Sequence, residues 1–415
     1  MTTPQVSSAG LASKKGGLVT ICICMLVAML DGVDLQSVGM AATRMAKEFS
    51  LSPAQLGWIF GTSAFGLLVG AAVGGRLADW LGRKRVLVPS VALFGLFSLA
   101  TTQVGSFDGL LVARFLTGLG LGAAAPLIVV MGTEAVSERW RNTAVGAMMC
   151  GMPFGAALVA LLDIVGSGNW RSIFYVGGFG PLVLLPLLAI FVQDSRQFVE
   201  AKAAVAHKKG KVIEALAGEG RVWMTAALWI AFIGTQIVAY FMMNWVPSLA
   251  AASGLTHTQA SMVLVLFDVG AAIGMSGMGY LADAMGFRKT IILVYLGLAV
   301  GLAMFAAASG LGPIAFAGLI CGLFIMGGQT VLSALAGYAY PTSVRGTGVG
   351  SAIAVGRVGA TLGPLAAGLL FSQGQSGTAL VIASIPLIVL SALAALLVVR
   401  SVTRRRRVSV DLWSA

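Results

Sequence analysis

The stretch GRLADWLG at residues 75–82 recurs as GYLADAMG at residues 279–286, so that the two copies are 204 residues apart. RNTAVG at 141–146 recurs as RGTGVG at 345–350 with the same offset. Because chance rarely holds one register over such distances, the repeats predict a chain built from two equivalent parts in parallel order.

The composition excludes an ordinary soluble domain. Of the 415 residues, 58% are hydrophobic and 10% are charged, and the mean hydropathy is +0.93. A soluble domain carries about 25% charged residues, so this chain is predicted to be an integral membrane protein. Roughly twelve apolar stretches approach the ~20 residues that a spanning helix needs. They are 18–43, 56–80, 86–104, 109–132, 142–164, 170–191, 222–248, 259–282, 290–309, 313–336, 344–372 and 377–400.

The positive charges predict the orientation in the membrane. With the N-terminus inside, the alternating loops place 22 of the 27 Lys and Arg residues on the cytoplasmic side. Cytoplasmic loops carry such an excess, so both termini are predicted to lie in the cytoplasm. The net charge of +12 is therefore interpreted as topology and as attraction of the tail to anionic lipid, not as nucleic-acid binding.

The expected fold is an all-α polytopic membrane protein with twelve transmembrane helices in two six-helix halves. We expect an N-terminal half at 1–192, a cytoplasmic central loop at 193–221, a C-terminal half at 222–400 and a basic cytoplasmic tail at 401–415. The first apolar run lacks a clear cleavage site and is expected to be retained as a span. Parallel halves of this kind are a transporter architecture, with the substrate near mid-membrane between them.

Two acids interrupt the first apolar span in MLDGVDLQ at residues 29–36. A charge at the centre of a span costs about 2.5–3.5 kcal/mol on insertion scales, and such residues usually face a cavity or a partner. Asp31 and Asp34 share one helix face, and burial and mutual repulsion both disfavour ionisation. The pair is predicted to share a proton and to titrate as a unit. The alternative is a structural ion pair with an arginine inside the membrane.

Two arginines are also predicted to lie inside the membrane. Arg114 cannot lose its proton in practice, so it needs Asp31, Asp34 or a substrate carboxylate as partner. We favour a relay role with the two acids over a fixed structural pair. Arg357 lies among small residues in VGRVG, and its guanidinium can hold a carboxylate by two parallel hydrogen bonds. We predict that it anchors the substrate carboxylate; the alternative is a bridge to Asp268 or to another buried polar group.

The repeat separates these charges from the duplicated frame. At the offset of 204 the two acids and the two arginines fall on uncharged residues, which are Thr235, Val238, Gly318 and Pro153. The cytoplasmic loop motifs are duplicated, whereas the buried charges are not. We therefore expect proton chemistry in the first half and carboxylate recognition in the second.

An aromatic substrate needs apolar and aromatic walls with a few polar contacts. The predicted substrate-binding residues besides Arg357 lie in the seventh, eighth and tenth spans. They are Tyr240, Phe241, Asn244, Trp245, Phe267 and Gln329.

GRLADWLGRK at 75–84 resembles the loop 2–3 motif of the major facilitator superfamily, and 279–289 resembles its second copy. With twelve predicted spans, the resemblance covers nearly the whole chain. It implies alternating access, in which this motif latches the halves while the outside is open. A topology signal alone explains Arg83 but not Asp79. The gating residues implied are Gly75, Asp79, Gly82, Arg83, Gly279, Asp283, Gly286 and Arg288, and Glu134 resembles another acidic position of the cytoplasmic side.

A narrower resemblance concerns DGVD at 31–34, RFLTGLGLGAAAP at 114–126 and GGQTVLSALAGYAYP at 327–341. These segments are similar to the aromatic acid:proton symporter family, and LSPAQLGWIF and NWVP are similar to its bacterial 3-(3-hydroxyphenyl)propionate transporters. The resemblance implies proton-driven uptake of an aromatic carboxylate across the bacterial cytoplasmic membrane. Benzoate, hydroxybenzoate or muconate are alternative substrates. Efflux by proton antiport is disfavoured because GAMMCGMPFGAALV lacks a clear GP-centred motif.

Other classes of function have little support in the sequence. The two His residues, His207 and His257, fall in predicted loops, and the four cysteines fall in spans without a metal-ligand pattern. We therefore expect no enzyme, no metal, no disulfide and no cofactor other than the proton gradient. A receptor or channel would need a sensing domain or filter segment that we do not find. The expected working unit is a monomer in the lipid bilayer.

Overall fold

The computed structural model describes residues 14–136, 148, 150–165, 169–191, 216, 218, 221–341 and 344–411. The predicted central loop at 193–221 therefore lies outside the described residues, except for 216, 218 and 221. All regular elements within the described part are α-helices. They are α1 (Lys14–Glu48), α2 (Pro53–Leu81), α3 (Arg83–Gln103), α4 (Phe107–Glu134), α6 (Gly151–Val165), α7 (Arg171–Phe191), α10 (Val222–Ala252), α11 (His257–Met285), α12 (Phe287–Ala307), α13 (Leu311–Ala339), α14 (Arg345–Ser372) and α15 (Gly377–Asp411).

Eleven helices of the described part are long and apolar enough to cross a membrane. The twelfth, α6, has the apolar stretch Gly151–Asp163. The sequence predicts a span over 142–164, of which 142–147 and 149 lie outside the described residues. Helices suit this environment because every backbone donor and acceptor along a span is satisfied within the helix.

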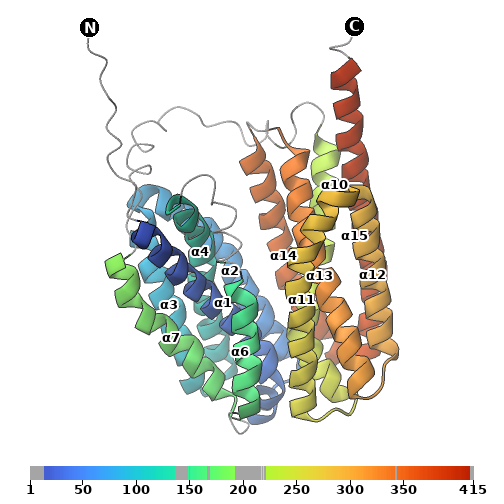
Figure 1. Cartoon of the computed structure of the whole chain (residues 1–415). Helices are drawn as coiled ribbons and strands as arrows, with labels where there is room; N and C mark the ends of the chain where they lie inside the picture. Colours follow the sequence, from blue (N-terminus) through green and yellow to red (C-terminus); the bar gives the residue numbers. More distant parts are fainter. Residues whose placement is uncertain are drawn as a thin grey trace, which may run out of the picture.

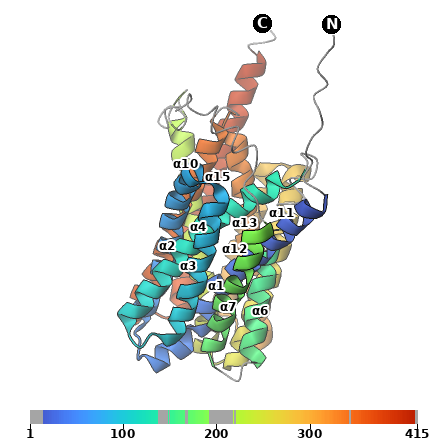
Figure 2. The ribbon, with the colours of Figure 1, turned by 90° about the vertical axis from the view of Figure 1, so that its left-hand side faces the viewer.

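The helices pack in two groups in Figure 1. The N-terminal group contains α1, α2, α3, α4, α6 and α7, and the C-terminal group contains α10 to α15. Figure 2 shows α3 and α7 side by side on the outer face of the N-terminal group. We call the end of the bundle where α1 begins and α15 ends the termini end, and the other the opposite end. The two groups meet at the opposite end and diverge toward the termini end (Figure 1).

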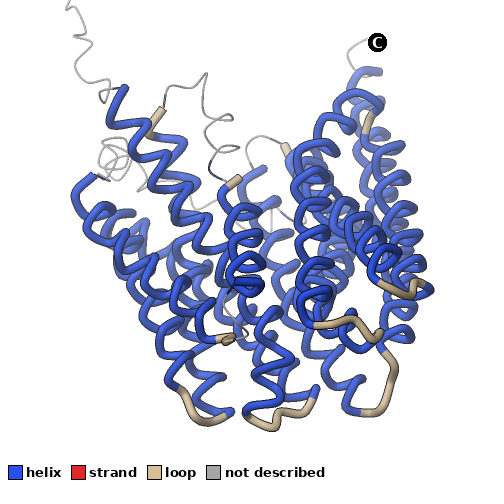
Figure 3. The backbone as a smooth tube through the Cα atoms, turned by 60° about the horizontal axis from the view of Figure 1, so that its bottom comes forward, coloured by secondary structure: helices blue, strands red, loops and turns tan. Residues whose placement is uncertain are grey.

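Short connections join the helices at the opposite end (Figure 3). At this end α2 and α11 begin with a capping box, in which the side chains of Ser52 and Gln55, and of Thr256 and Gln259, exchange hydrogen bonds with backbone N–H groups. Such a box satisfies two of the donors that a helix N-terminus leaves unpaired. The two boxes are 204 residues apart, so the sequence repeat is also a repeat of local structure.

Glycines bring α2 against α4 and α11 against α13. A Cβ added at Gly70 would lie 2.1 Å from the carbonyl oxygen of Leu119, and one at Gly274 would lie 1.9 Å from that of Leu323. No side chain fits such an approach, which small residues at helix interfaces allow. The contacts on the two sides again differ by 204 residues, and the spacing of these glycines therefore reflects close helix packing.

Glycine also ends α2 and α11. Gly82 has a φ of 106° and Gly286 a φ of 82°, and each donates its N–H to the carbonyl of an alanine four residues earlier. Positive φ is a conformation that glycine adopts without steric cost. Both loop motifs thus turn the chain sharply from one helix directly into the next, α3 and α12 respectively.

Close contacts between the two groups lie toward the opposite end. A Cβ at Gly57 of α2 would lie 3.0 Å from the Cα of Gly368 in α14. One at Gly39 of α1 would lie 3.1 Å from the backbone oxygen of Asn244 in α10. These approaches place α1 and α2 directly against α10 and α14, and the charged residues predicted from the sequence lie near this junction.

Candidate functional site

Asp34 and Arg114 form a buried ion pair between α1 and α4. Arg114 donates from Nη1 to Asp34 Oδ1 at 3.0 Å and from Nη2 to Asp34 Oδ2 at 2.5 Å. The side chains of both residues are 1% exposed. This two-pronged geometry is the strong form of an arginine–carboxylate contact. Of the partners that the sequence left open for Arg114, the structure shows Asp34.

Neighbouring polar and aromatic groups complete the surroundings of this pair. Arg114 Nη2 also donates to Ser63 Oγ of α2 at 3.2 Å, and Ser98 Oγ of α3 donates to Asp34 Oδ1 at 3.4 Å. The guanidinium carbon lies 5.6 Å from the centre of the Phe174 ring of α7. Five helices of the N-terminal group, α1, α2, α3, α4 and α7, therefore surround the pair, whose two charges balance each other.

Asp31 lies one turn earlier on α1, and its surroundings differ from those of Asp34. It is 8% exposed, and its Oδ1 is buried without a hydrogen-bond partner. Among the described residues no cationic side chain forms an ion pair with Asp31 within 4.0 Å, although Asp31 is in electrostatic range of Asp34 and of Arg357 in α14. The two acids of the DGVD segment thus have separate surroundings: Asp34 is held by Arg114, whereas Asp31 faces the C-terminal group.

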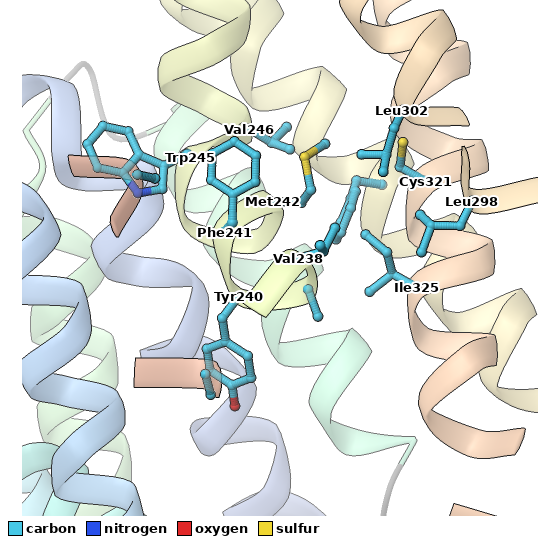
Figure 4. Packing of buried hydrophobic residues seen from close by; sticks show 14 of the residues in the cluster. Val238, Tyr240, Phe241, Met242, Trp245, Val246, Leu298, Leu302, Cys321 and Ile325 are labelled. Atoms are coloured by element: carbon cyan, nitrogen blue, oxygen red, sulfur yellow. The ribbon is translucent and has the colours of Figure 1, made fainter. Parts of the chain in front are cut away.

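Arg357 of α14 donates from Nη1 to the hydroxyl of Tyr240 in α10 at 2.8 Å. The guanidinium has five N–H donors, and this is its hydrogen bond in the described structure. Of the alternative partners that the sequence left open, Asp268 forms no ion pair with Arg357 among the described residues, whereas the Tyr240 hydroxyl is a buried polar group. Figure 4 shows the side chains of Val238 and Met242 directed toward α12 and α13, whereas Tyr240 on the same helix points another way.

A small cavity lies between the two groups next to these residues. Tyr240 and Asn244 of α10 line it from the C-terminal group, and Arg114 and Ser63 from the N-terminal group. The remaining lining residues are apolar: Leu35, Val38, Phe60, Ala64, Leu67 and Met243. The cavity therefore combines apolar walls, one aromatic hydroxyl, an amide and a guanidinium.

The other predicted substrate-binding residues lie outside this lining. Trp245 is buried, contacts the rings of Phe60 and Phe371, and donates from Nε1 to the Pro364 carbonyl at 3.3 Å. Phe241 and Phe267 are buried in the core of the C-terminal group (Figure 4 labels Phe241). Gln329 donates from Nε2 to Gln236 Oε1 at 2.9 Å within that group.

The predicted gating residues lie at the termini end of α2, α3, α11 and α12. Gly75, Gly82, Gly279 and Gly286 occupy the loop motifs described above, with Gly75 and Gly279 in the last turns of α2 and α11. Arg83 is half-buried, whereas Asp283 and Arg288 are exposed. The side chains of Asp79 and Glu134 lie outside the described residues.

Sequence reasoning missed a polar cluster at the opposite end. Asp163 of α6 is buried, and its Oδ1 accepts from Arg44 Nη1 of α1 at 2.6 Å. Its Oδ2 accepts from Ser261 Oγ of α11 at 2.6 Å and lies 3.0 Å from His257 Nε2. The cluster joins the two groups. In the sequence, the sole sign of this cluster is the acid Asp163 at the end of an apolar stretch, and such an acid does not indicate its partner.

A second missed contact joins the groups nearer their middle. Gln36 of α1 donates from Nε2 to Asp268 Oδ1 of α11 at 2.6 Å, and both side chains are buried. Asp268 entered the sequence analysis solely as an alternative partner of Arg357. Within the part of the chain that is described, no group of three or more His, Cys, Asp and Glu side chains could hold a metal ion.

Comparison with known proteins identifies the family. The sequence matches the profile described as "Major Facilitator Superfamily" over residues 24–256 and 238–411. It is 41% identical over 407 residues to the 3-(3-hydroxy-phenyl)propionate transporter of Escherichia coli K12, covering 98% of each chain. It is 30% identical over 387 residues to the 4-hydroxybenzoate transporter PcaK of Pseudomonas putida, covering 85% of this chain and 86% of the relative. The chain therefore belongs to the major facilitator superfamily.

Solved structures agree with this fold. A D-xylose–proton symporter superposes with a TM-score of 0.76 at 18% identity, covering 92% of this chain and 97% of that one. A bacterial homologue of the lysosomal transporter Spinster, inward-facing and unoccupied, gives 0.75 at 15% identity, covering 95% and 99%. The protein is thus a multi-pass transporter of the inner membrane, not an enzyme, as the sequence predicts.

Proposed function

We propose that this chain imports an aromatic carboxylate together with protons, and that a hydroxyphenylpropanoate such as 3-(3-hydroxyphenyl)propionate is its substrate. The observation that carries the proposal is a cavity that both helix groups line. Arg114, which binds Asp34, lines it from the N-terminal group, and Tyr240, which accepts from Arg357, lines it from the C-terminal group. Asp31 lies in electrostatic range of Arg357. The names of the relatives support the substrate class.

Asp31 is the residue that we propose to carry the coupled proton. A buried carboxyl group without an ion-pair partner is more easily held as the neutral acid, since burial disfavours a charge. Asp34 has Arg114 as a countercharge and can remain ionised. In this scheme the Asp34–Arg114 pair keeps its charges, whereas the charge on Asp31 changes during transport.

Arg357 and Tyr240 are proposed to bind the substrate. The guanidinium can hold the carboxylate, and the Tyr240 hydroxyl, now accepting from Arg357, can turn to a phenolic group. An anion on Arg357 removes the positive charge that Asp31 faces. Binding of the anion and binding of a proton to Asp31 therefore support each other, and this coupling is reciprocal. Asn244 lines the same cavity, and Trp245 packs against Phe60 of its wall. Phe267 and Gln329 stay proposed substrate-binding residues of the C-terminal group.

The two helix groups are proposed to be the six-helix halves, at 1–192 and 222–400, with both termini and the tail at 401–415 in the cytoplasm. The opposite end then faces outward and is closed by the contacts of Asp163. We propose that this is an inward-open state and that the loop motifs with Asp79, Arg83, Asp283 and Arg288 latch the two halves in the outward-open state. A single chain contains all the proposed site residues, so we propose that a monomer works alone.

The test is uptake into proteoliposomes that contain the purified full chain under an imposed pH gradient. We expect accumulation of phenylpropanoates with an acidic exterior, weaker uptake of benzoates, 4-hydroxybenzoate and muconate, and none of neutral analogues. Collapse of the gradient with a protonophore should abolish accumulation. Uptake of none of these acids, or uptake that ignores the gradient, would overturn the proposal.

A further inference from the structure

Asp268 and Gln36 form a buried link between the two helix groups, separate from the site around Asp31. Gln36 Nε2 donates to Asp268 Oδ1 at 2.6 Å across 232 residues of sequence. Gln36 is 2% exposed and Asp268 is 8% exposed. The link lies between α1 and α11, on the side of the bundle's middle that is nearer the opposite end.

Two oxygen atoms of this link lack a hydrogen-bond donor. Asp268 Oδ2 and Gln36 Oε1 are both buried and both lack a hydrogen-bond partner. Each of the two oxygens is an acceptor, and an unsatisfied buried acceptor is costly. A single proton on Asp268 supplies the missing donor, because a protonated carboxyl group has an O–H donor. Its O–H can donate to Gln36 Oε1 while Gln36 Nε2 continues to donate to Oδ1.

No countercharge compensates Asp268 if it is ionised. Helix α11 packs against α6, α10, α12 and α13, and it meets α1 through Gln36. In the described part of the chain, none of the titratable or charged groups near this surface forms a hydrogen bond or an ion pair with Asp268. These groups are Asp31, Asp34 and Arg44 of α1, Asp163 of α6, Tyr240 of α10, His257 of α11, Tyr295 of α12 and Cys321 of α13.

We propose that Asp268 is a second proton-binding site, which takes up one proton per transport cycle in addition to that on Asp31. The inference rests on the proposed proton-coupled import. The proton comes from outside water and adds to a carboxylate oxygen of Asp268. The neutral acid then pairs with Gln36 by two hydrogen bonds and holds α1 against α11 while the opposite end is closed.

Release of this proton to cytoplasmic water resets the carrier. Ionised Asp268 leaves a buried charge and two unsatisfied acceptor oxygens at the junction, and a buried charge without a partner is strongly unfavourable. The contact between α1 and α11 then separates, and Asp268 reaches water as the outer side opens. Two protons per monovalent anion also make transport electrogenic, because one net positive charge moves inward.

The experiment measures the accumulation limit of 3-(3-hydroxyphenyl)propionate in proteoliposomes that contain the full chain. The membrane potential is held at zero with potassium and valinomycin, and the pH gradient is one unit. A tenfold proton gradient balances about a tenfold anion gradient with one proton and about a hundredfold gradient with two. We expect about a hundredfold for the wild type and about tenfold for Asp268→Asn, whose amide can donate to Gln36 without carrying a proton.

The matched control is Asp108→Asn, which alters an exposed acid in the first turn of α4 and should keep the wild-type limit. A wild-type limit near tenfold, or an unchanged limit in Asp268→Asn, would overturn the second site. A wild-type limit near tenfold would overturn the second site even where the variant cannot be purified. Absence of any gradient-driven accumulation in the wild type would instead overturn the proposed function itself.

Discussion

Asp34→Asn and Asp31→Asn are chemically the same change, yet the structure predicts very different losses in the free energy of unfolding. Asp34→Asn leaves the buried guanidinium of Arg114 opposite a neutral amide. Breaking a buried pair by removing one partner costs about 3–5 kcal/mol, because the other charge stays behind. Asp31→Asn removes a group that has no ion-pair partner, so we expect at most about 1 kcal/mol in the free energy of unfolding.

The assay compares the free energy of unfolding of the purified variants in an SDS titration with proton-driven uptake. Asp31→Asn should unfold like the wild type but lose uptake under a pH gradient. Asp34→Asn should be destabilised by at least about 3 kcal/mol, roughly a 150-fold change in the folding equilibrium. The double variant Asp34→Asn/Arg114→Gln removes both charges and should recover part of the lost stability. Equal stability of the two single variants, or simple additivity in the double variant, would refute the reasoning.

Three further predictions concern other parts of the molecule. Arg357→Lys keeps the charge but loses the planar pair of donors. Because one charge-assisted hydrogen bond contributes about 1.5–3 kcal/mol, the KM for the aromatic acid should rise about tenfold or more. An unchanged KM would show that Arg357 is not the anchor. Gly274→Ala places a methyl group 1.9 Å from a backbone oxygen and should destabilise the chain by about 1–3 kcal/mol in the same titration, whereas Gly277→Ala, with nothing within 4 Å, should not. Asp163→Asn weakens the contact between α6 and α11. It should increase labelling of a cysteine placed at Val38, in a background without native cysteines, by a membrane-impermeant thiol reagent added outside. Labelling equal to that of the parent would show that this contact does not close the outer side.

Much of the fold could be predicted because it depends on local pattern. The apolar runs predict the helices, since a span must be about 20 apolar residues long whatever it packs against. The offset of 204 in the sequence recurs in the structure, in the capping boxes at Ser52 and Thr256 and in the glycine contacts of Gly70 and Gly274. The first part of the predicted span 142–164, residues 142–147 and 149, lies outside the described residues, and α6 is described from Gly151.

The residue types of the site could be predicted from the sequence, but which residues contact each other could not. A charge within an apolar run marks Asp31, Asp34, Arg114 and Arg357 as candidates, because such residues rarely face lipid. The same rule applies to Asp268, which sequence reasoning used only as another residue's partner. Spacing on one helix suggested that Asp31 and Asp34 act as a pair, whereas in the structure Asp34 binds Arg114 and Asp31 Oδ1 has no hydrogen-bond partner.

The sequence by itself determined that this is a duplicated, all-helical membrane protein with a few buried charges, since hydropathy, charge bias and repeats act along the chain. The tertiary structure decided which of those charges meet. Arg114 reaches Asp34 across 80 residues, Asp163 reaches Ser261 across 98, and Gln36 reaches Asp268 across 232. Such partners depend on how helices rotate and pack against one another, and no local property of either segment encodes that choice.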